Sequence, residues 1–95
     1  MDDELRFCWD HDKAVLNLEK HGVSFAAATY VFDDPVRLEQ EDVFAQGEYR
    51  NIVIGQVDGV LLTVVYSSPE DELYRIISAR PCTAHERKAY EQNFF

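Results

Sequence analysis

The sequence has little cysteine and no long apolar run. Only two cysteines occur in 95 residues. Cys8 and Cys82 are far apart and match no metal-ligand spacing, so we expect two free thiols in a reducing compartment. No apolar run approaches the roughly 18 residues that span a bilayer, and residues 1–7 show no basic segment followed by an apolar one. We therefore expect a cytoplasmic protein with no membrane contact.

Familiar sequence motifs of enzymes are also absent. The four glycines form neither a glycine-rich phosphate loop nor a Gly-x-Ser-x-Gly nucleophile elbow. A zinc site would have to combine His11, His21, His85 and a cysteine, and no pair of these residues has a ligand spacing. We therefore expect neither a metal ion nor a cofactor.

Positive charge is scarce and unevenly distributed. Nine Lys and Arg residues oppose eighteen Asp and Glu residues, which gives a net charge of −9. An acidic surface repels a phosphate backbone, so any nucleic-acid role must depend on a local basic site. Such a stretch exists near the C-terminus, where Glu86 is the only carboxylate between Leu73 and Tyr90. Its cations could bind an anion, dock an acidic partner or be solvating charge, and they are Arg75, Arg80, Arg87 and Lys88.

Residues 5–21 predict a strand followed by a helix. Over residues 5–9 the apolar Leu5, Phe7 and Trp9 alternate with Arg6 and Cys8, as in a strand. Asp10 is a good N-cap for a helix over residues 11–21, and Gly22 stands where a C-terminal glycine belongs. The two sides of this helix are expected to differ in polarity, with Ala14, Val15 and Leu18 on the apolar side and Lys13, Asn17 and Lys20 on the polar side.

A second, shorter helix is predicted directly after the first. Ser24 can cap it and residues 25–31 supply it. Pro35 marks its end, because the residue before a proline disfavours helical dihedrals. The two helices are joined tightly at Gly22, so we expect a bent pair that lies on a flat surface.

The middle of the chain predicts antiparallel strands and turns. An acidic edge strand is predicted over residues 36–42, and a turn follows at residues 45–47. Asp58-Gly59 is a strong signal for a type I′ hairpin turn, and a further turn is predicted at residues 68–71. The remaining predicted strands are residues 49–57, 60–67 and 73–80.

A last helix is predicted after the break at Pro81. Thr83 and Glu86 fit a capping box at its start, and the helix should end near Gln92. The order of elements predicts one α+β domain over residues 1–95. In this domain the N-terminal helical pair packs on an antiparallel β-sheet, and a C-terminal helix follows.

The arginines of the last predicted strand are the leading candidates for an anion site. Alternation places Arg75 and Arg80 on opposite sides of the sheet, unless a bulge intervenes. A mid-strand arginine is costly to bury without an acceptor, so one alternative is a structural pair with a carboxylate. The other is a guanidinium that binds phosphate, which its planar fork suits. The backbone amides at the start of the last helix would reinforce an anion site at Arg80.

His21 ends the first predicted helix beside Lys20. A histidine in this position most often caps or packs. It could also act as a general base, because the ordinary histidine pKa lies close to neutral pH. Both alternatives stay open on the sequence alone.

Several blocks of the sequence, taken together, resemble a known family. They are FCWD at residues 7–10, Lys13 and Asn17, KHGVSF at 20–25, VFDDP at 31–35, EYR at 48–50, Ile54-Gly55 with the apolar strand to Tyr66, RIISAR at 75–80 and ERKAYE at 86–91. In this order they resemble the BrnT-type toxins, also known as the DUF497 family, over most of the chain. The KHGVSF and RIISAR blocks together are the most specific part.

The resemblance implies a metal-independent endoribonuclease toxin of a type II toxin–antitoxin pair, with a fold similar to RelE-type toxins. It implies RNA as substrate and a BrnA-like ribbon-helix-helix antitoxin as protein partner, with DNA bound only through that antitoxin in operon repression. A homodimer or a toxin–antitoxin heterotetramer is compatible with it. By position, the implied catalytic residues are Lys20, His21, Arg50, Arg75 and Arg80, and the substrate-binding residues are Lys13, Ser78 and Arg87.

Charge separates this chain from the family, because toxins that act on RNA are commonly basic. A second hypothesis follows from this difference. In it the chain is a non-catalytic module that docks an antitoxin through its cations and Phe94-Phe95, and it acts in operon repression.

Overall fold

The computed structural model describes residues 5–45 and 47–95, without the side chains of residues 42–45. The predicted turn at residues 45–47 includes Gln46, which lies outside the described residues. The elements are β1 (Arg6–Cys8), α1 (His11–His21), α2 (Phe25–Ala28), the 3-10 helix η1 (Thr29–Asp33), β2 (Leu38–Ala45), β3 (Glu48–Val57), β4 (Val60–Glu70), β5 (Leu73–Pro81) and α3 (Ala84–Gln92).

The five strands form one sheet in the order β1-β5-β4-β3-β2. The prediction of an α+β fold is confirmed, but the prediction of an antiparallel sheet is wrong, because β1 pairs with β5 in parallel. The sheet is therefore mixed. Alternation within residues 5–9 predicts a strand, but it carries no information about which strand it pairs with or in which direction.

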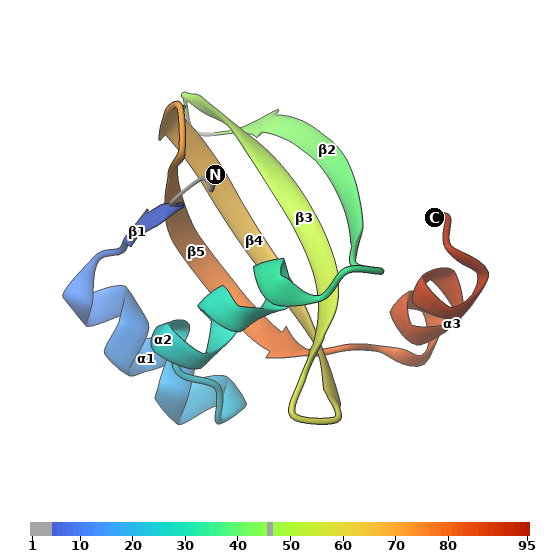
Figure 1. The fold of residues 1–95 in the computed structure, drawn as a ribbon. Helices are drawn as coiled ribbons and strands as arrows, with labels where there is room; N and C mark the ends of the chain where they lie inside the picture. Colours follow the sequence, from blue (N-terminus) through green and yellow to red (C-terminus); the bar gives the residue numbers. More distant parts are fainter. Residues whose placement is uncertain (1–4, 46) are drawn as a thin grey trace.

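The two faces of the sheet are covered by different helices (Figure 1). On the first, which we call the helical face, α2 and η1 pack on the larger core, and Gly55 of β3 lies under η1. A Cβ on Gly55 would be 2.9 Å from the carbonyl oxygen of Val31, so only glycine permits this close approach. The buried residues of this core are Val23, Phe25, Ala28, Val31, Phe32, Val53, Leu62, Val64, Tyr66, Ile76 and Ala79.

The opposite face, which we call the α3 face, carries a smaller apolar cluster. Ala89 of α3 packs there against Leu38, Ile54 and Leu61. In Figure 1, α3 lies across the sheet from α1, near β2 and β3. This arrangement leaves the α3 face covered at one end only.

The expected polarity of the two sides of α1 is confirmed only in part, because Ala14 packs against the larger core while the predicted polar side supplies the buried Asn17. Asn17 is the one buried residue of α1 in the described chain, whereas Val15 is 42%, Leu16 63% and Leu18 50% exposed. The Asn17 amide donates to the carbonyl of Ala79 at 2.8 Å and accepts from the Ala79 N–H at 3.2 Å. Strand β5 extends past the end of the short β1 here, so Asn17 supplies the backbone partners that β1 no longer offers.

The predicted caps and most turns are present. Asp10, Ser24 and Thr83 each accept a backbone N–H at a helix start. Asp58 and Gly59 both have positive φ, at 50° and 83°, as a type I′ turn requires. The turn predicted at residues 68–71 is misplaced, because β4 continues to Glu70 and β5 begins at Leu73.

Candidate functional site

A bulge in β5 brings both candidate arginines to the α3 face. Arg75 lies opposite Ser67 and Arg80 lies opposite Thr63, and the register shifts by one residue between these pairs. Thr63 and Ser67 are four residues apart on β4, so they point to the same side of the sheet. The bulge therefore overrides the simple alternation that would have placed the two arginines on opposite sides. Ser78, opposite Val65, lies on this face between them.

One transverse row of this face gathers polar side chains from four strands. Cys8 of β1 lies opposite Arg75, and Arg75 lies opposite Ser67. Arg50 precedes Asn51, which pairs with Tyr66, so Arg50 lies beside Ser67. Ser67 is 2% exposed, and its hydroxyl oxygen has no hydrogen-bond partner among the described residues.

Arg75 is held by one carboxylate in this row. Its Nη1 donates to Glu48 Oε1 at 2.9 Å. The two side chains are 43% and 32% exposed. Such a pair, open to solvent, contributes little to folding, typically about 0–1 kcal/mol.

A cavity of about 380 Å³ adjoins this row at the β1 side of the sheet. It is lined by Cys8, Trp9, Asp10, Lys13 and Arg75. Asp10 holds the start of α1, because its Oδ1 accepts the Lys13 N–H at 3.0 Å. Helix α1 thus brings Lys13 to the same hollow as the guanidinium of Arg75.

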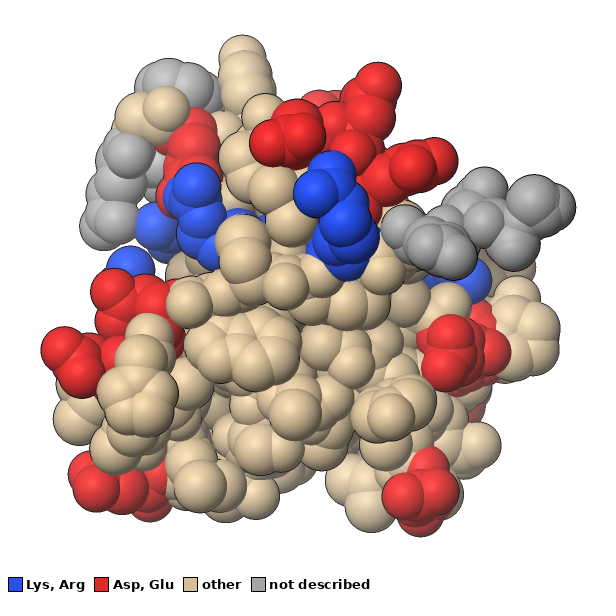
Figure 2. All heavy atoms as spheres, turned by 60° about the vertical axis from the view of Figure 1, so that its left-hand side comes forward, with Lys and Arg blue, Asp and Glu red and all other residues tan. Residues whose placement is uncertain are grey.

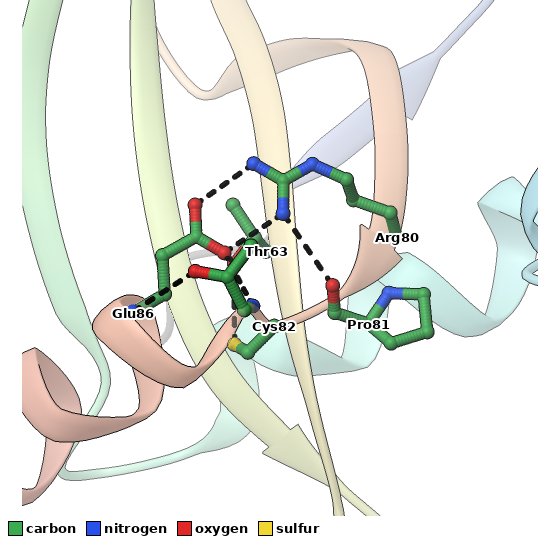
Figure 3. Close-up of polar contacts among 6 residues, drawn as sticks. Thr63, Arg80, Pro81, Cys82 and Glu86 are labelled. Atoms are coloured by element: carbon green, nitrogen blue, oxygen red, sulfur yellow. Dashed lines mark hydrogen bonds and ion pairs between the residues drawn. The ribbon is translucent and has the colours of Figure 1, made fainter.

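Arg80 has a different environment at the other end of β5. Its Nη1 and Nη2 donate to the two carboxylate oxygens of Glu86, both at 2.8 Å (Figure 3). The same carboxylate accepts from the Thr63 hydroxyl and from the Thr83 N–H, both at 2.9 Å. The bonds from Arg80 lower the pKa of Glu86 to about 2, although burial opposes them. Glu86 is therefore an anion at neutral pH and cannot serve there as a general acid.

Helix α3, which carries Glu86, is also tied to the loop after η1. The Tyr90 hydroxyl donates to Asp34 Oδ2 at 2.7 Å, and this bond raises the pKa of Tyr90 to about 12. Burial alone would raise the pKa of Asp34, but bonds from Tyr90, Val36 and Gln56 outweigh it and lower that pKa. Helix α3 is thus held at both of its ends.

The remaining predicted residues are distributed along the face rather than gathered. Lys13 shares the cavity with Arg75 and Asn17 bonds Ala79, so α1 advances along β5 in the direction of Arg80. Lys20 and His21, one turn after Asn17, are therefore level with the Arg80 end and away from the cavity. Arg87 is exposed on α3.

The two candidate arginines do not meet at one point. Four register positions separate them along β4, which is about 13 Å of strand. The structure therefore brings Arg50, Arg75 and Lys13 to one end of the α3 face. It leaves Arg80 at the other end, while α1, with Lys20 and His21, lies along the β5 edge of the sheet.

Two residues near Arg75 were not singled out by sequence reasoning. Glu48 meets Arg75 across the intervening β4, a contact that needs the register of three strands. Trp9 could have been noticed from its position between a strand and the Asp10 cap, but nothing in the sequence places Arg75 beside it. His11 and His85 are exposed and both cysteines are free, as expected.

Residues 5–45 and 47–95 lack two features that would indicate metal binding or membrane insertion. No three His, Cys, Asp or Glu side chains are grouped so that they could hold a metal ion within that part of the chain. None of its helices combines the length and apolar character needed to cross a bilayer.

A second surface feature lies on α1, outside the α3 face. An apolar groove of about 210 Å³ runs between α1 and α2. Val15 and Leu18 line it, and the exposed Leu16 lies beside them on α1. Figure 2 shows an uncharged surface over the lower part of this side of the molecule, with Asp and Glu side chains at its margins. Exposed Asp12 and Glu19 on α1 are among the acidic residues near it.

One family model matches most of this chain. Residues 9–86 match the model for the "Ribonuclease toxin, BrnT, of type II toxin-antitoxin system". The chain is similar to the crystal structure of the Brucella abortus ribonuclease toxin BrnT, with a TM-score of 0.62 at 22% identity. That match covers 83% of this chain and 97% of the Brucella chain. At this identity, the match supports the fold alone. Among curated protein sequences none matches the chain.

Proposed function

Because this chain belongs to the BrnT family of ribonuclease toxins of type II toxin–antitoxin systems, we propose that it is a metal-independent endoribonuclease. The family implies an antitoxin protein as partner. In the proposal this partner is a BrnA-like ribbon-helix-helix protein that binds DNA, represses the shared operon and neutralises the toxin in the cytoplasm.

The proposed reaction uses the RNA as its own nucleophile. The ribose 2′-oxygen forms a bond to the adjacent phosphorus, and the bond from phosphorus to the 5′-oxygen of the next nucleotide breaks. A base takes the proton of the 2′-hydroxyl, and an acid gives a proton to the leaving 5′-oxygen. The products are a 2′,3′-cyclic phosphate and a 5′-hydroxyl.

The observation that carries the proposal is the cation row at the Arg75 end of the α3 face. Arg50 and Arg75 lie on either side of Ser67, and Lys13 joins them from α1. Guanidinium groups that face a phosphate stabilise the charge that develops on it in the transition state. A local group of cations of this kind can bind a phosphate although the net charge of the chain is negative, because it needs no basic surface elsewhere.

The proton transfers are assigned to amine or imidazole groups of α1, of which Lys13 shares a cavity with Arg75. Lys20 and His21 lie level with Arg80 at the C-terminal end of α1, and His21 is half-buried. An amine or an imidazole can take or give a proton near neutral pH. Lys20 and His21 stand about 13 Å of strand from Arg75, so they can transfer a proton only at a phosphate bound at the Arg80 end. Lys13 can do so at a phosphate held by Arg75. Ser78 and Arg87 would contact the RNA strand between and beyond these groups.

One observation favours the alternative of a partner-binding module. Leu16 and Leu18 expose apolar side chains on α1, and Asp12 and Glu19 flank them. Apolar side chains between carboxylates suit an antitoxin segment whose own apolar residues are flanked by Lys or Arg. A second copy of this acidic chain would bring like charges together there, which disfavours self-association through this surface.

RNA cleavage by the purified protein tests the proposal. Single-stranded and structured RNA should be cut between pH 6 and 9, equally with and without EDTA, and the new 3′ ends should carry 2′,3′-cyclic phosphates. A well-folded protein that cuts no RNA across this range would leave the partner-binding alternative. Cleavage that EDTA abolishes would contradict the metal-independent part.

A further inference from the structure

Trp9 has no role in the proposed cleavage chemistry, although it lies beside Lys13 and Arg75. Trp9 is 37% exposed, and its ring packs edge-to-face on Phe25 with ring centroids 6.0 Å apart. It lines the apolar groove with Val15 and also the polar cavity with Lys13 and Arg75. Trp9 is therefore shared by the two hollows.

We propose that the cavity beside Trp9 is a nucleobase subsite, in which a base of single-stranded RNA stacks on the indole while Lys13 and Arg75 hold its phosphate. This inference rests on the proposed function, because it names a part of the RNA path. Aromatic side chains beside a positively charged groove are the usual means of binding single strands. The adjacent cations also favour the π-face of a bound base.

The dimensions and the charges of the cavity suit a nucleotide. Its volume of about 380 Å³ lies within the usual range for small-ligand cavities, about 300–1,000 Å³. Lys13 is exposed, and the Arg75 side chain is 43% exposed, so both can reach a phosphate. The bond from Arg75 Nη1 to Glu48 uses only one of the five N–H donors of a guanidinium.

Asp10 adds a preference among the bases. Asp10 lines the same cavity, and its Oδ1 accepts the Lys13 N–H. A carboxylate can accept a hydrogen bond from an exocyclic amino group, such as N4 of cytosine. Uracil has a carbonyl at that position, which the carboxylate would repel. The subsite should therefore bind cytosine more tightly than uracil.

The emission of Trp9 reports directly on the subsite, because the sequence contains a single tryptophan. The probes are 2′-O-methyl tetranucleotides of cytosine and of uracil, which lack the attacking hydroxyl and so bind without being cut. Both should quench Trp9 saturably, and the cytosine probe should bind about 5-fold more tightly or better.

Variants of Trp9 measure its share of the affinity. With dye-labelled cytosine probe and fluorescence anisotropy, Trp9→Leu should weaken binding about 10-fold to 100-fold. Trp9→Phe keeps a stacking face and should stay within about 3-fold of the original. Tyr30→Leu is the matched control, because Tyr30 is an exposed aromatic residue on η1, away from the cavity. Circular dichroism would verify that each variant is folded.

The results separate this inference from the proposed function. Unchanged Trp9 emission with bound probe, or equal affinity of Trp9→Leu and the original chain, would overturn the subsite. Absence of probe binding by the folded chain would overturn it as well. RNA cleavage in those cases would leave the proposed function standing, whereas Trp9-dependent binding without any cleavage would keep the subsite and reject the nuclease.

Discussion

Arg75 and Arg80 stand at the two ends of β5 on the same face of the sheet, but their surroundings differ. Arg80 makes two bonds of 2.8 Å to Glu86, whose side chain is 16% exposed. Arg75 makes one bond of 2.9 Å to Glu48, whose side chain is 32% exposed. The Arg80 end is covered by α3, and the Arg75 end opens into a cavity.

The difference separates a guanidinium that belongs to the fold from one that can exchange its partner. Glu86 is bound by Arg80, Thr63 and Thr83 together, so moving Arg80 to a phosphate would leave several groups without partners. Glu48 can be released to water at little cost. Phosphate binding should therefore depend more on Arg75 than on Arg80.

The largest expected effect is at the open end. Arg75→Ala should lower the rate of RNA cleavage about 10²-fold to 10³-fold, because it removes a donor to the charge that develops on phosphate. Arg75→Lys should recover only part of this rate, because an ammonium lacks the planar fork. Initial rates on one defined RNA would measure both.

Arg37→Ala supplies the control for that experiment. Arg37 pairs with Glu39 at 2.7 Å and has a similar exposure, but Glu39 bonds Tyr66 on the helical face. Its loss should change the cleavage rate less than about 2-fold, in line with surface pairs elsewhere. Equal losses for the two variants would remove the distinction between the faces.

The sequence predicts the local features of both ends better than their surroundings. Helix α1, the capping box of Thr83 and Glu86, and the Asp58-Gly59 turn all follow from short-range signals and are present. Caps and turns depend on neighbours within a few residues, which the sequence displays directly. For the same reason Lys13 could be placed on the right helix, whereas Trp9, predicted at the end of the first strand, lies just after β1.

The relation between distant elements could not be predicted in the same way. The bulge that brings Arg75 and Arg80 to one face depends on packing across β4 and β5. Glu86 caps the start of α3 and also binds Arg80. The second contact depends on where α3 lies relative to β5, which the sequence does not show. The polar Asn17 is buried only because β1 ends before β5 does, a consequence of strand pairing that no pattern within α1 reveals.

A smaller effect is expected at the closed end, and it concerns stability. Glu86→Gln should lower the free energy of unfolding at pH 7 by about 1–2 kcal/mol, less than a fully buried pair would lose because solvent screens this one. The pKa of Glu86 falls from 4.5 to about 2 on folding. The carboxylate therefore stabilises the fold above about pH 4.5, and this contribution is lost as the pH falls toward 2.

Urea unfolding at a series of pH values would measure this effect. The stability difference between the original chain and Glu86→Gln should be full at pH 7 and should vanish as the pH approaches 2. A difference that stays constant over that range would show that the charge of Glu86 is not what holds Arg80.

The smallest effect should come from Glu48→Gln, and this substitution should strengthen RNA binding instead of weakening it. The substitution removes the anion that competes with phosphate for Arg75, so the 2′-O-methyl cytosine probe should bind about 2-fold to 5-fold more tightly, a gain of under about 1 kcal/mol. Stability should change by no more than that, since the pair is partly exposed. Glu70→Gln is the matched control, because Glu70 pairs with Arg6 at 3.5 Å and lies outside the cavity. Weaker probe binding by Glu48→Gln would mean that Glu48 orients Arg75 for phosphate instead of competing for it. Arg75 and Arg80 would then differ in how they are oriented and not in how readily each can exchange its carboxylate for a phosphate.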